Sequence, residues 1–535
     1  MKVHRFNAVV FSAIVAFGGF VFGLDAALIA GTTDFITADF SLSPMQLGTA
    51  VSAPAWGVLV ALPFAGLVCN AFGRKRALQI VSILYLVSAV SSAAAPNYWT
   101  LVAARFLGGL AFSSLSLASM YIGEIAPPKW RGKLVSITQI NIVIGLSSAY
   151  FVNYLIYRWS QSGADWAVAM GFVDHTWRWM LGSEIPFTIL WTLLLFLVPE
   201  SPSWLFYRGR ADDAKKTLQR ILPDDAIEQH LGEMQESLAK STTSNSVVSQ
   251  LKEIFSRRMS LTLVIAFSIA IAQQTTGINA ILFYAQTVFK QLGIGSDAAF
   301  AQAVWVGLTS IVFTVLGLLL VDKLGRRPLI IWGMVWIVAS LAICSFAFKQ
   351  ARYTLPEQAM ARIADVEVVG KLQPLVEVEY QTDLAFKAAV KGALGEKESA
   401  AHVSGLLQDA TRMNAGLVLF GILSFIGAFH FSVGPVMWVL FSEIFPISIR
   451  GIAIPFFTIV TSLTSALVQK AFPWQLENMG MGSIFLFYAG TVTVGLAILF
   501  FTLRETKNMS IEAIQEALAV KGGWRKNPVG TEESA

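Results

Sequence analysis

A block of amide and hydroxyl side chains interrupts an otherwise apolar stretch of this chain. It runs from Gln273 to Tyr284 as Gln-Gln-Thr-Thr-Gly-Ile-Asn-Ala-Ile-Leu-Phe-Tyr, and no Lys, Arg, Asp or Glu falls between Met259 and Phe289. Amides and hydroxyls inside a bilayer must pair with one another or face a wet cavity. Because Gly277 allows a bend or a close approach of a ligand, the block predicts a solute-binding helix; hydrogen bonding between helices is the alternative.

Two charged residues lie inside other apolar runs. Asp25 falls in the run 8–30 and Arg105 in the run 99–121, each roughly five or six residues, or about 8 to 9 Å, from the outer end of its run. Equal depth makes an ion pair possible, and a charge at this depth is costly if it is unpaired. The two residues therefore predict a pair that takes up and releases a proton, with a purely structural salt bridge as the alternative.

Only a polytopic membrane protein could position these residues. The chain has 535 residues, of which 55% are hydrophobic and 14% charged, and its mean hydropathy of +0.62 lies outside the range of soluble domains. Apolar runs of about 20 residues fall at 8–30, 47–70, 77–95, 99–121, 134–156, 179–198, 259–289, 300–321, 329–348, 414–441, 451–472 and 481–503. The sequence thus predicts an all-α membrane protein with twelve transmembrane helices, the first of them retained and not cleaved as a signal peptide.

The placement of Lys and Arg predicts the orientation of these spans. With the N-terminus inside, the inner loops hold Arg74, Lys75, Arg76, Lys129, Arg131, Lys133, Lys323, Arg326, Arg327 and Arg450, whereas the outer loop 31–46 holds none. The positive-inside rule therefore places both termini in the cytoplasm. The two cysteines, Cys69 and Cys344, lie in apolar runs, so the sequence predicts no metal, no cofactor and no disulfide framework, and it has no nucleic-acid signature.

Motifs at the inner ends of the spans repeat between two halves of the chain. Gly73-Arg74-Lys75-Arg76 recurs as Gly325-Arg326-Arg327, and Gly123-Glu124-Ile125 recurs as Ser442-Glu443-Ile444. Two six-helix repeats packed face to face form a midplane cavity and can rock about it. We expect an N-terminal bundle over 1–200, a cytoplasmic helical linker over 201–258, a C-terminal bundle over 259–505 and a cytoplasmic tail over 506–535. The longer motif spacing in the second half locates an outer insertion at about 349–412, with short amphipathic helices.

Together these motifs resemble the sugar porter family of the major facilitator superfamily, over nearly the whole chain outside the insertion. The shared signatures are Gly73-Arg74-Lys75, Arg105 with Gly108-Gly109, Gly123-Glu124 with Arg131-Gly132, Pro199-Glu200-Ser201-Pro202, Gln273-Gln274 with Gly277-Ile278-Asn279, Asp322 with Gly325-Arg326-Arg327, Gly434-Pro435 with Trp438, and Glu505-Thr506-Lys507. The resemblance implies the major facilitator fold, with two pseudo-symmetric halves of six helices.

The resemblance also implies roles for particular residues. Positions that line the sugar site in that family match Phe22, Gln139, Gln273, Gln274, Asn279 and Trp438. Amides can pair with adjacent sugar hydroxyls and an aromatic face can pack on a sugar ring, although Trp438 could instead be an interfacial anchor. Asp25 matches the proton acceptor of the family's symporters and Arg105 its partner. The family's inner charge network, whose pairs would latch the outward-facing state, matches Arg74, Glu124, Arg131, Glu200, Arg326, Glu443, Arg450 and Glu505.

The chain departs from the family pattern in three regions. Asn70 and Ala71 replace an acid and a base after the second span, whereas Asp322 and Lys323 keep them, so we expect a weaker latch in the first half. His430 stands where many members carry Glu, and a lone His in an apolar helix more often packs than relays protons. Ser462 occupies a region where a sugar-site Trp or amide is common, which leaves the sugar open.

The sequence therefore predicts proton-coupled import of a monosaccharide (hexose, pentose or cyclitol) by alternating access across the cell membrane. An uncoupled sugar facilitator is the runner-up, and a non-transporting sugar sensor is a further alternative. We do not expect an enzyme, because the sequence holds no nucleophile–base or metal constellation. The expected partners are a small-molecule sugar, a proton and the lipid bilayer, with the monomer as the functional unit.

Overall fold

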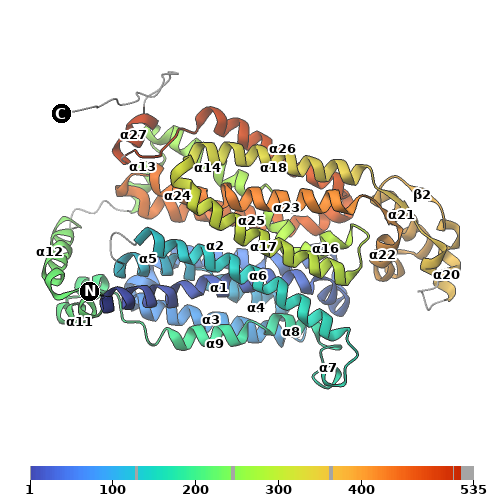
Figure 1. Cartoon of the computed structure of the whole chain (residues 1–535), viewed down its shortest axis with the longest axis horizontal. Coiled ribbons are helices and arrows are strands. Elements are labelled where there is room, and N and C mark those ends of the chain that lie inside the picture. Colours follow the sequence, from blue (N-terminus) through green and yellow to red (C-terminus); the bar gives the residue numbers. More distant parts are fainter. Residues whose placement is uncertain (1, 127–130, 242–246, 361–365, 510, 520–535) are drawn as a thin grey trace.

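The molecule consists of two bundles of long helices that lie side by side, drawn in blue to cyan and in yellow to red in Figure 1. The computed structural model describes residues 2–126, 131–241, 247–360, 366–509 and 511–519. The N-terminus, the linker helices and α27 lie at one end of the bundles, which we call the inner end. The opposite end, which carries α7 and α20–α22, is called the outer end.

The N-terminal bundle, the N-half, contains nine helices among the described residues. They are α1 (Lys2–Phe40), α2 (Pro44–Phe72), α3 (Arg74–Ala93), α4 (Tyr98–Ala111), α5 (Ser114–Ile125), α6 (Arg131–Ser160), α7 (Asp165–Ala169), α8 (Thr176–Gly182) and α9 (Ile185–Leu194). Helices α4 and α5 together form one span, from Tyr98 to Ile125. Local sequence sets several starts: Ser43 forms a capping box with Gln46 ahead of α2, and the Asn97 side chain caps α4.

The C-terminal bundle, the C-half, begins after a linker of short helices. The linker holds α10 (Pro202–Tyr207), α11 (Ala211–Ile221), α12 (Asp224–Ser241), α13 (Val247–Ile254) and the 3₁₀ helix η1 (Arg257–Met259). The C-half then holds α14 (Ser260–Gln274), α15 (Ile278–Phe283), α16 (Ala285–Lys290), α17 (Ser296–Leu324), α18 (Arg326–Lys349), α23 (Ala415–Phe431), α24 (Val433–Ile444), α25 (Ile447–Asn478) and α26 (Met481–Thr502), followed by α27 (Ile511–Ala519).

Residues between α18 and α23 form a small outer domain with its own core. It comprises β1 (Arg352–Thr354), α19 (Glu357–Met360), α20 (Val366–Leu372), η2 (Gln373–Leu375), β2 (Glu379–Tyr380), α21 (Asp383–Leu394), α22 (Glu396–Ala410) and β3 (Thr411–Arg412). The strands pair antiparallel in the order β2-β1-β3, with Tyr353 opposite Tyr380 and Thr411. The sequence predicted the helices of this insertion and missed the sheet, because its strands are only two or three residues long.

The sixth predicted span differs from the expected continuous helix. Eleven helical segments of the described chain are long and apolar enough to cross a membrane, and the run 179–198 is not one of them. It forms α8 and α9, which are separated at Ser183 and Glu184. Pro186 lies in the first turn of α9, where the missing N–H costs nothing, so the sequence favours a helix start here. The broken span places Glu184 at the junction.

Glycines bring α1 and α6 into backbone contact. A methyl group added at Gly23 would lie 2.0 Å from the Ile142 carbonyl oxygen, and one added at Gly145 would lie 2.1 Å from that of Phe20. Gly19 and Gly23 are spaced as in the small-residue motifs that let membrane helices approach closely. This contact sets α1, which carries Phe22 and Asp25, directly against α6, which carries Gln139.

Candidate functional site

The amide block lies at a break between α14 and α15. Gly277 has a φ of +80°, a conformation that favours glycine, and a methyl group added there would lie 2.5 Å from the Tyr488 ring. The glycine therefore serves both the turn and the close packing of α26. The break directs Gln273 and Gln274, at the end of α14, toward Asn279, at the start of α15.

Hydrogen bonds join these amides into one chain. The Gln274 Nε2 donates to Gln273 Oε1 at 2.9 Å, and Asn279 Nδ2 donates to Gln274 Oε1 at 2.9 Å. At the other end of the chain, Gln273 Nε2 lies 3.4 Å from the Gly434 carbonyl oxygen of α24. Gln273 is buried, whereas Gln274 and Asn279 are half-buried. Neighbouring amides held in register offer alternating donors and acceptors, as a polyhydroxylated ligand requires.

Two residues of α25 extend this chain of hydrogen-bonded amides, and the sequence analysis did not select them. Asn279 Nδ2 also donates to Ser465 Oγ at 2.7 Å, and Gln469 Nε2 donates to the same oxygen at 2.7 Å. Both residues are buried. Ser465 and Gln469 are one helical turn apart, so their four-residue spacing in an apolar run was the available signal.

The remaining residues of the predicted sugar site make no recorded hydrogen bond to these amides. Trp438 lies on α24, one turn from Gly434, and 38% of its surface is exposed. Phe22 is half-buried, with its ring edge-to-face on Phe112 at 4.4 Å. Gln139 is half-buried on α6. The structure thus joins the three C-half amides directly and places the other three residues on separate helices.

The charged pair predicted in the N-half is present and buried. Arg105 Nη1 lies 3.4 Å from Asp25 Oδ1, with 2% and 7% of the two side chains exposed. A methyl group added at Gly108 would lie 3.3 Å from Asp25 Oδ2, so the glycine makes room for the carboxylate. The distance is long for a charge-assisted hydrogen bond, and neither Asp25 Oδ2 nor Arg105 Nε has a partner among the described residues.

A second acid, which the sequence analysis missed, completes this group. Glu184 is 3% exposed at the junction of α8 and α9, and it interacts electrostatically with both Asp25 and Arg105. Its Oε2 has no hydrogen-bond partner among the described residues. It is the only acid in the predicted span 179–198, which is the same signal that selected Asp25.

The composition of this group favours binding of one proton. We call Asp25, Arg105 and Glu184 the charged triad. The described group holds two buried carboxyl groups and one guanidinium, of which only Asp25 and Arg105 form a recorded ion pair, so full ionisation would leave one uncompensated negative charge in a buried site. Burial of an unbalanced charge is costly, and like charges in one site disfavour each other. A proton on either carboxyl group balances the triad.

The predicted inner network forms within each half. In the N-half, Arg74 pairs with Glu124 at 2.8 Å, Glu124 accepts from the Ser201 hydroxyl, and Glu200 accepts from the backbone N–H of Arg74 at 2.8 Å. In the C-half, Arg326 pairs with Glu443 at 2.8 Å, Glu443 accepts from the Thr506 hydroxyl at 2.6 Å, and Glu505 accepts from the backbone N–H of Arg326 at 3.0 Å. The two constellations therefore correspond group by group.

Two residues of the predicted network, Arg131 and Arg450, differ from the other six. Arg450 donates to the Phe445 carbonyl oxygen at 3.1 Å and makes no recorded ion pair, whereas the Arg131 side chain lies outside the described residues. The C-half has one extra acid, since Asp322 lies 3.0 Å from Arg326, at the position where the N-half has Asn70. Each recorded ion pair of the network joins elements of one half, so none of these pairs clamps the halves together.

The recorded polar contacts between the halves lie toward the outer end. Among residues with described side chains, the polar contacts are Lys290 Nζ to Asp34 Oδ2 at 2.6 Å, Thr33 Oγ1 to Thr287 Oγ1 at 3.1 Å, Arg158 Nη1 to Asp297 Oδ2 at 3.4 Å, and Tyr150 Oη to the Leu282 carbonyl oxygen at 2.7 Å. Tyr157 also stacks on Phe300, with ring centroids 4.4 Å apart. The recorded polar contacts therefore join the halves at the outer end, whereas the recorded ion pairs of the inner networks lie within one half, and the predicted latch stays a prediction.

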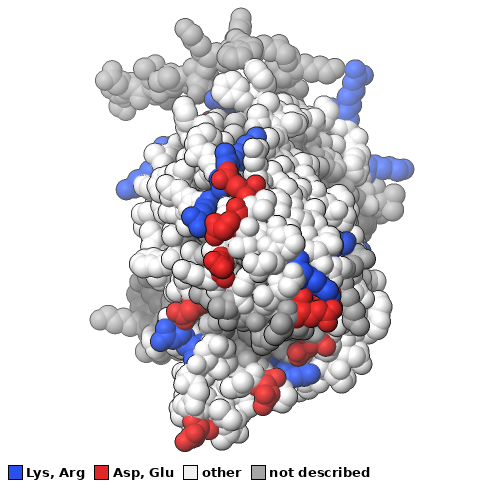
Figure 2. Space-filling model, turned by 90° about the vertical axis from the view of Figure 1, so that its right-hand side faces the viewer, with Lys and Arg blue, Asp and Glu red and all other residues white. Residues whose placement is uncertain are grey.

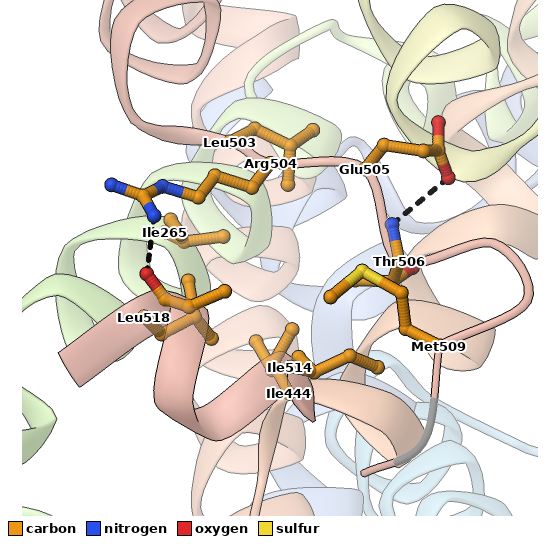
Figure 3. Close-up of a pocket in the computed structure, with 10 residues that line it drawn as sticks. Ile265, Ile444, Leu503, Arg504, Glu505, Thr506, Met509, Ile514 and Leu518 are labelled. Carbon is orange, nitrogen blue, oxygen red and sulfur yellow. Dashed lines mark hydrogen bonds between the residues drawn. The ribbon is translucent and has the colours of Figure 1, made fainter. Parts of the chain in front are cut away.

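Two cavities lie at the inner end of the C-half, away from the amide chain. The first, shown in Figure 3, holds about 10 Å³ between Ile265, Ile444 and Leu518, where α27 packs against the bundle. Arg504 Nη1 donates to the Ala517 carbonyl oxygen and so helps to hold α27. The second cavity, of about 180 Å³, is lined by Glu253, Arg258 and Gln515 among others. Neither cavity touches the charged triad.

His430 takes a packing position in α23. It is buried, its Nδ1 lies 3.2 Å from Thr314 Oγ1 of α17, and its ring lies edge-to-face with that of Phe429. No Asp, Glu, Lys or Arg is recorded in contact with it among the described residues. No group of three or more His, Cys, Asp or Glu that could hold a metal ion occurs in the described part of the chain.

Comparison with known proteins places this geometry in context. Residues 11–366 and 399–518 match the model of the family described as "Sugar (and other) transporter", and the gap in the match falls inside the outer domain. The chain is 30% identical to the D-xylose-proton symporter of Escherichia coli (strain K12), covering 98% of this chain and 96% of that protein. It is 29% identical to the arabinose-proton symporter of Bacillus subtilis (strain 168), covering 95% and 94%.

A solved structure is similar over nearly the whole chain. It is the xylose transporter XylE from E. coli in a partially occluded, inward-open conformation, with a TM-score of 0.70 and 27% identity over 94% of this chain and 99% of that one.

Proposed function

Because this chain belongs to the sugar porter family of the major facilitator superfamily, we propose that it imports a monosaccharide together with a proton. Membership makes it a multi-pass membrane transporter and not an enzyme, and it explains the pairing of two six-helix halves. The sequence-based predictions of family and fold class are therefore confirmed.

We propose that both termini are cytoplasmic, in a cell membrane. The inner end carries the basic residues Arg74, Lys75, Arg326 and Arg327, whereas the described outer loop at 41–43 holds no Lys or Arg. Lys and Arg are enriched on the cytoplasmic side of membrane proteins. In this orientation the closed outer end faces away from the cytoplasm, so the structure corresponds to the inward-facing state.

The amide chain of the C-half supplies the sugar site in this proposal. Gln273, Gln274 and Asn279 present donors and acceptors in register, and Ser465 and Gln469 hold Asn279 in place from α25. A sugar that replaces some of these internal hydrogen bonds loses little hydrogen bonding on leaving water. In this proposal Phe22 and Trp438 pack against the sugar ring.

The charged triad of the N-half supplies the proton site. Asp25 takes a proton when the outer end is open, which balances Glu184 and Arg105 and removes the cost of an unpaired buried charge. The loaded protein then rocks to the inward-facing state, in which sugar and proton leave toward the cytoplasm. Outer contacts such as Lys290–Asp34 and Tyr157–Phe300 form in this step and must break to reset the cycle.

The observation that carries proton coupling is the burial of two acids around one arginine. An uncoupled carrier needs no such imbalance, since a balanced pair or neutral residues would hold the helices equally well. The functional unit in this proposal is the monomer, because the amide chain and the charged triad each lie within one chain.

The test is uptake of labelled glucose, xylose, fructose and myo-inositol into proteoliposomes, with and without an inward proton gradient. Accumulation above the outside concentration only with the gradient would support symport and identify the sugar. Equilibration that ignores the gradient would make the protein a facilitator, and absence of flux for every sugar would favour a sensor.

A further inference from the structure

A compact lobe projects from the outer end of the N-half beside α8. We call residues 159–179 the outer foot; it includes α7 and lies at the lower edge of Figure 1. Its surface exposes large apolar side chains: Trp166 is 49% exposed, Val168 54% and Met170 51%. Clustered exposed apolar groups of this size mark contact sites on membrane proteins and soluble proteins alike.

The outer foot is held by an aromatic cluster. Trp159 lies edge-to-face with Trp166 at 5.7 Å and with Phe172 at 5.5 Å, and Phe172 stacks on Trp179 at 4.7 Å. Trp179 Nε1 donates to the Met170 carbonyl oxygen at 3.2 Å. These contacts fix the backbone that presents Trp166 and Met170, so the apolar surface is a defined face.

The residues around this face favour contact with the lipid interface. Figure 1 shows α9, α8 and α7 along the same edge of the N-half, and α9 exposes the apolar side chains of Ile189, Leu190 and Leu193. Trp is enriched where hydrocarbon meets the headgroups, because its ring is apolar and its N–H is polar. A surface continuous with a lipid-facing helix and rich in Trp fits the outer interface of a bilayer.

Charge around the outer foot specifies the kind of lipid. Its exposed acids are Asp165 and Asp174. Its arginine, Arg178, donates to the Ala93 and Ala95 carbonyl oxygens. Figure 2, which views the outer end, shows mainly uncharged surface on the lower lobe with a few acidic groups. A site for anionic headgroups would need free basic groups, so the face suits neutral or zwitterionic lipid.

We propose that the outer foot rests in the outer headgroup interface of zwitterionic lipid and anchors the surface on which the halves close. The same small core that contains Phe172 and Met180 also contains Phe300 of the C-half. Next to it, Tyr157 stacks on Phe300 and Arg158 pairs with Asp297. The lipid contact thus holds the N-half part of the outer contact still, while the C-half moves against it. This inference depends on membrane embedding alone and not on sugar or proton specificity.

The test measures membrane depth with a nitroxide label on Val168→Cys or Met170→Cys, in vesicles of phosphatidylcholine. Cys69 and Cys344 are buried, so the label attaches at the new cysteine. Gln381→Cys, on the exposed surface of the outer domain, is the matched control. We expect oxygen to broaden the paramagnetic resonance signals of labels at 168 and 170 strongly and a water-soluble nickel chelate to broaden them weakly. At 381 we expect the opposite order.

Three results would overturn the proposal. Nickel accessibility at 168 and 170 equal to that at 381 would place the outer foot in water. Dipolar broadening that disappears on dilution with unlabelled protein would identify a second copy of the chain as the occupant. Protection that requires anionic lipid or is lost in high salt would assign the face to electrostatic binding. Because no transport is measured, a failure here is distinct from a failure of the proposed function.

Discussion

The two halves share their architecture and differ in the chemistry of the side chains that they bury. The N-half buries charge, with Asp25, Glu184 and Arg105 in one group. The C-half instead joins neutral amides and a hydroxyl, from Gln273 to Gln469, by hydrogen bonds. Charges respond to protons, whereas neutral donors and acceptors suit sugar hydroxyls. The difference indicates that the N-half binds the proton and the C-half binds the sugar.

The largest effect is expected from a substitution in the N-half that removes proton coupling and leaves sugar binding by the C-half unchanged. Asp25→Asn removes the proton acceptor and should abolish accumulation while sugar counterflow continues. A membrane potential of 100 mV is worth about 2.3 kcal/mol per charge, so one coupled proton sustains about 50-fold accumulation that the variant should lose. Uptake and counterflow in the same proteoliposomes measure this. Loss of counterflow together with accumulation would show that Asp25 serves sugar binding or folding as well.

The reciprocal change is in the C-half. Asn279→Ala removes the donor to Gln274 and Ser465, and it should weaken sugar binding by about 5- to 150-fold, which corresponds to roughly 1–3 kcal/mol for a lost buried hydrogen bond. Coupling should persist at saturating sugar. Thr464→Ala is the control, since Thr464 bonds only within its own helix, to Val460. Sugar titration by calorimetry distinguishes the two variants, and equal affinities would remove Asn279 from the site.

A smaller effect is expected inside the charged triad. With Glu184→Gln the negative charge beside Asp25 is lost and Arg105 holds the aspartate ionised more firmly, so proton loading should need a more acidic outside. We expect the pH of half-maximal uptake to fall by about one unit, equivalent to about 1.4 kcal/mol. The pH profile of uptake measures this, with Glu253→Gln at the inner end as the control. An unchanged profile would exclude Glu184 from the proton site.

The smallest effect is expected on stability, from exchanging the one acid by which the two inner networks differ. Asp322→Asn removes the acid that only the C-half possesses, and Asn70→Asp supplies it to the N-half. Because 79% of the Asp322 side chain is exposed, the pair should contribute at most about 1 kcal/mol. Thermal unfolding of the purified protein should show a small loss for the first variant and a small gain for the second. Destabilisation by both would mean that the two networks are not equivalent.

The sequence analysis identified the site residues whose side chains stand out in their own apolar run. Asp25, Arg105 and the Gln273–Asn279 block were identified because charge and amides are rare in apolar runs. Glu184 carried the same signal and was overlooked, since its run was treated as one unbroken span. For Ser465 and Gln469 the sequence carried only the weaker signal of their four-residue spacing, because hydroxyls in membrane helices usually bond their own backbone, and the bond from Asn279 to Ser465 depends on the packing of α25 against α15. The short sheet of the outer domain depends likewise on pairing between distant segments.

Simultaneous recording of sugar and proton movement tests most directly whether the N-half binds the proton and the C-half binds the sugar. Sugar is added outside proteoliposomes that contain a pH-sensitive dye, without an imposed gradient, for the wild type, Asp25→Asn and Asn279→Ala. We predict internal acidification in step with sugar entry for the wild type, sugar entry without acidification for Asp25→Asn, and acidification at raised sugar concentrations for Asn279→Ala. Sugar entry without acidification in the wild type would contradict the account.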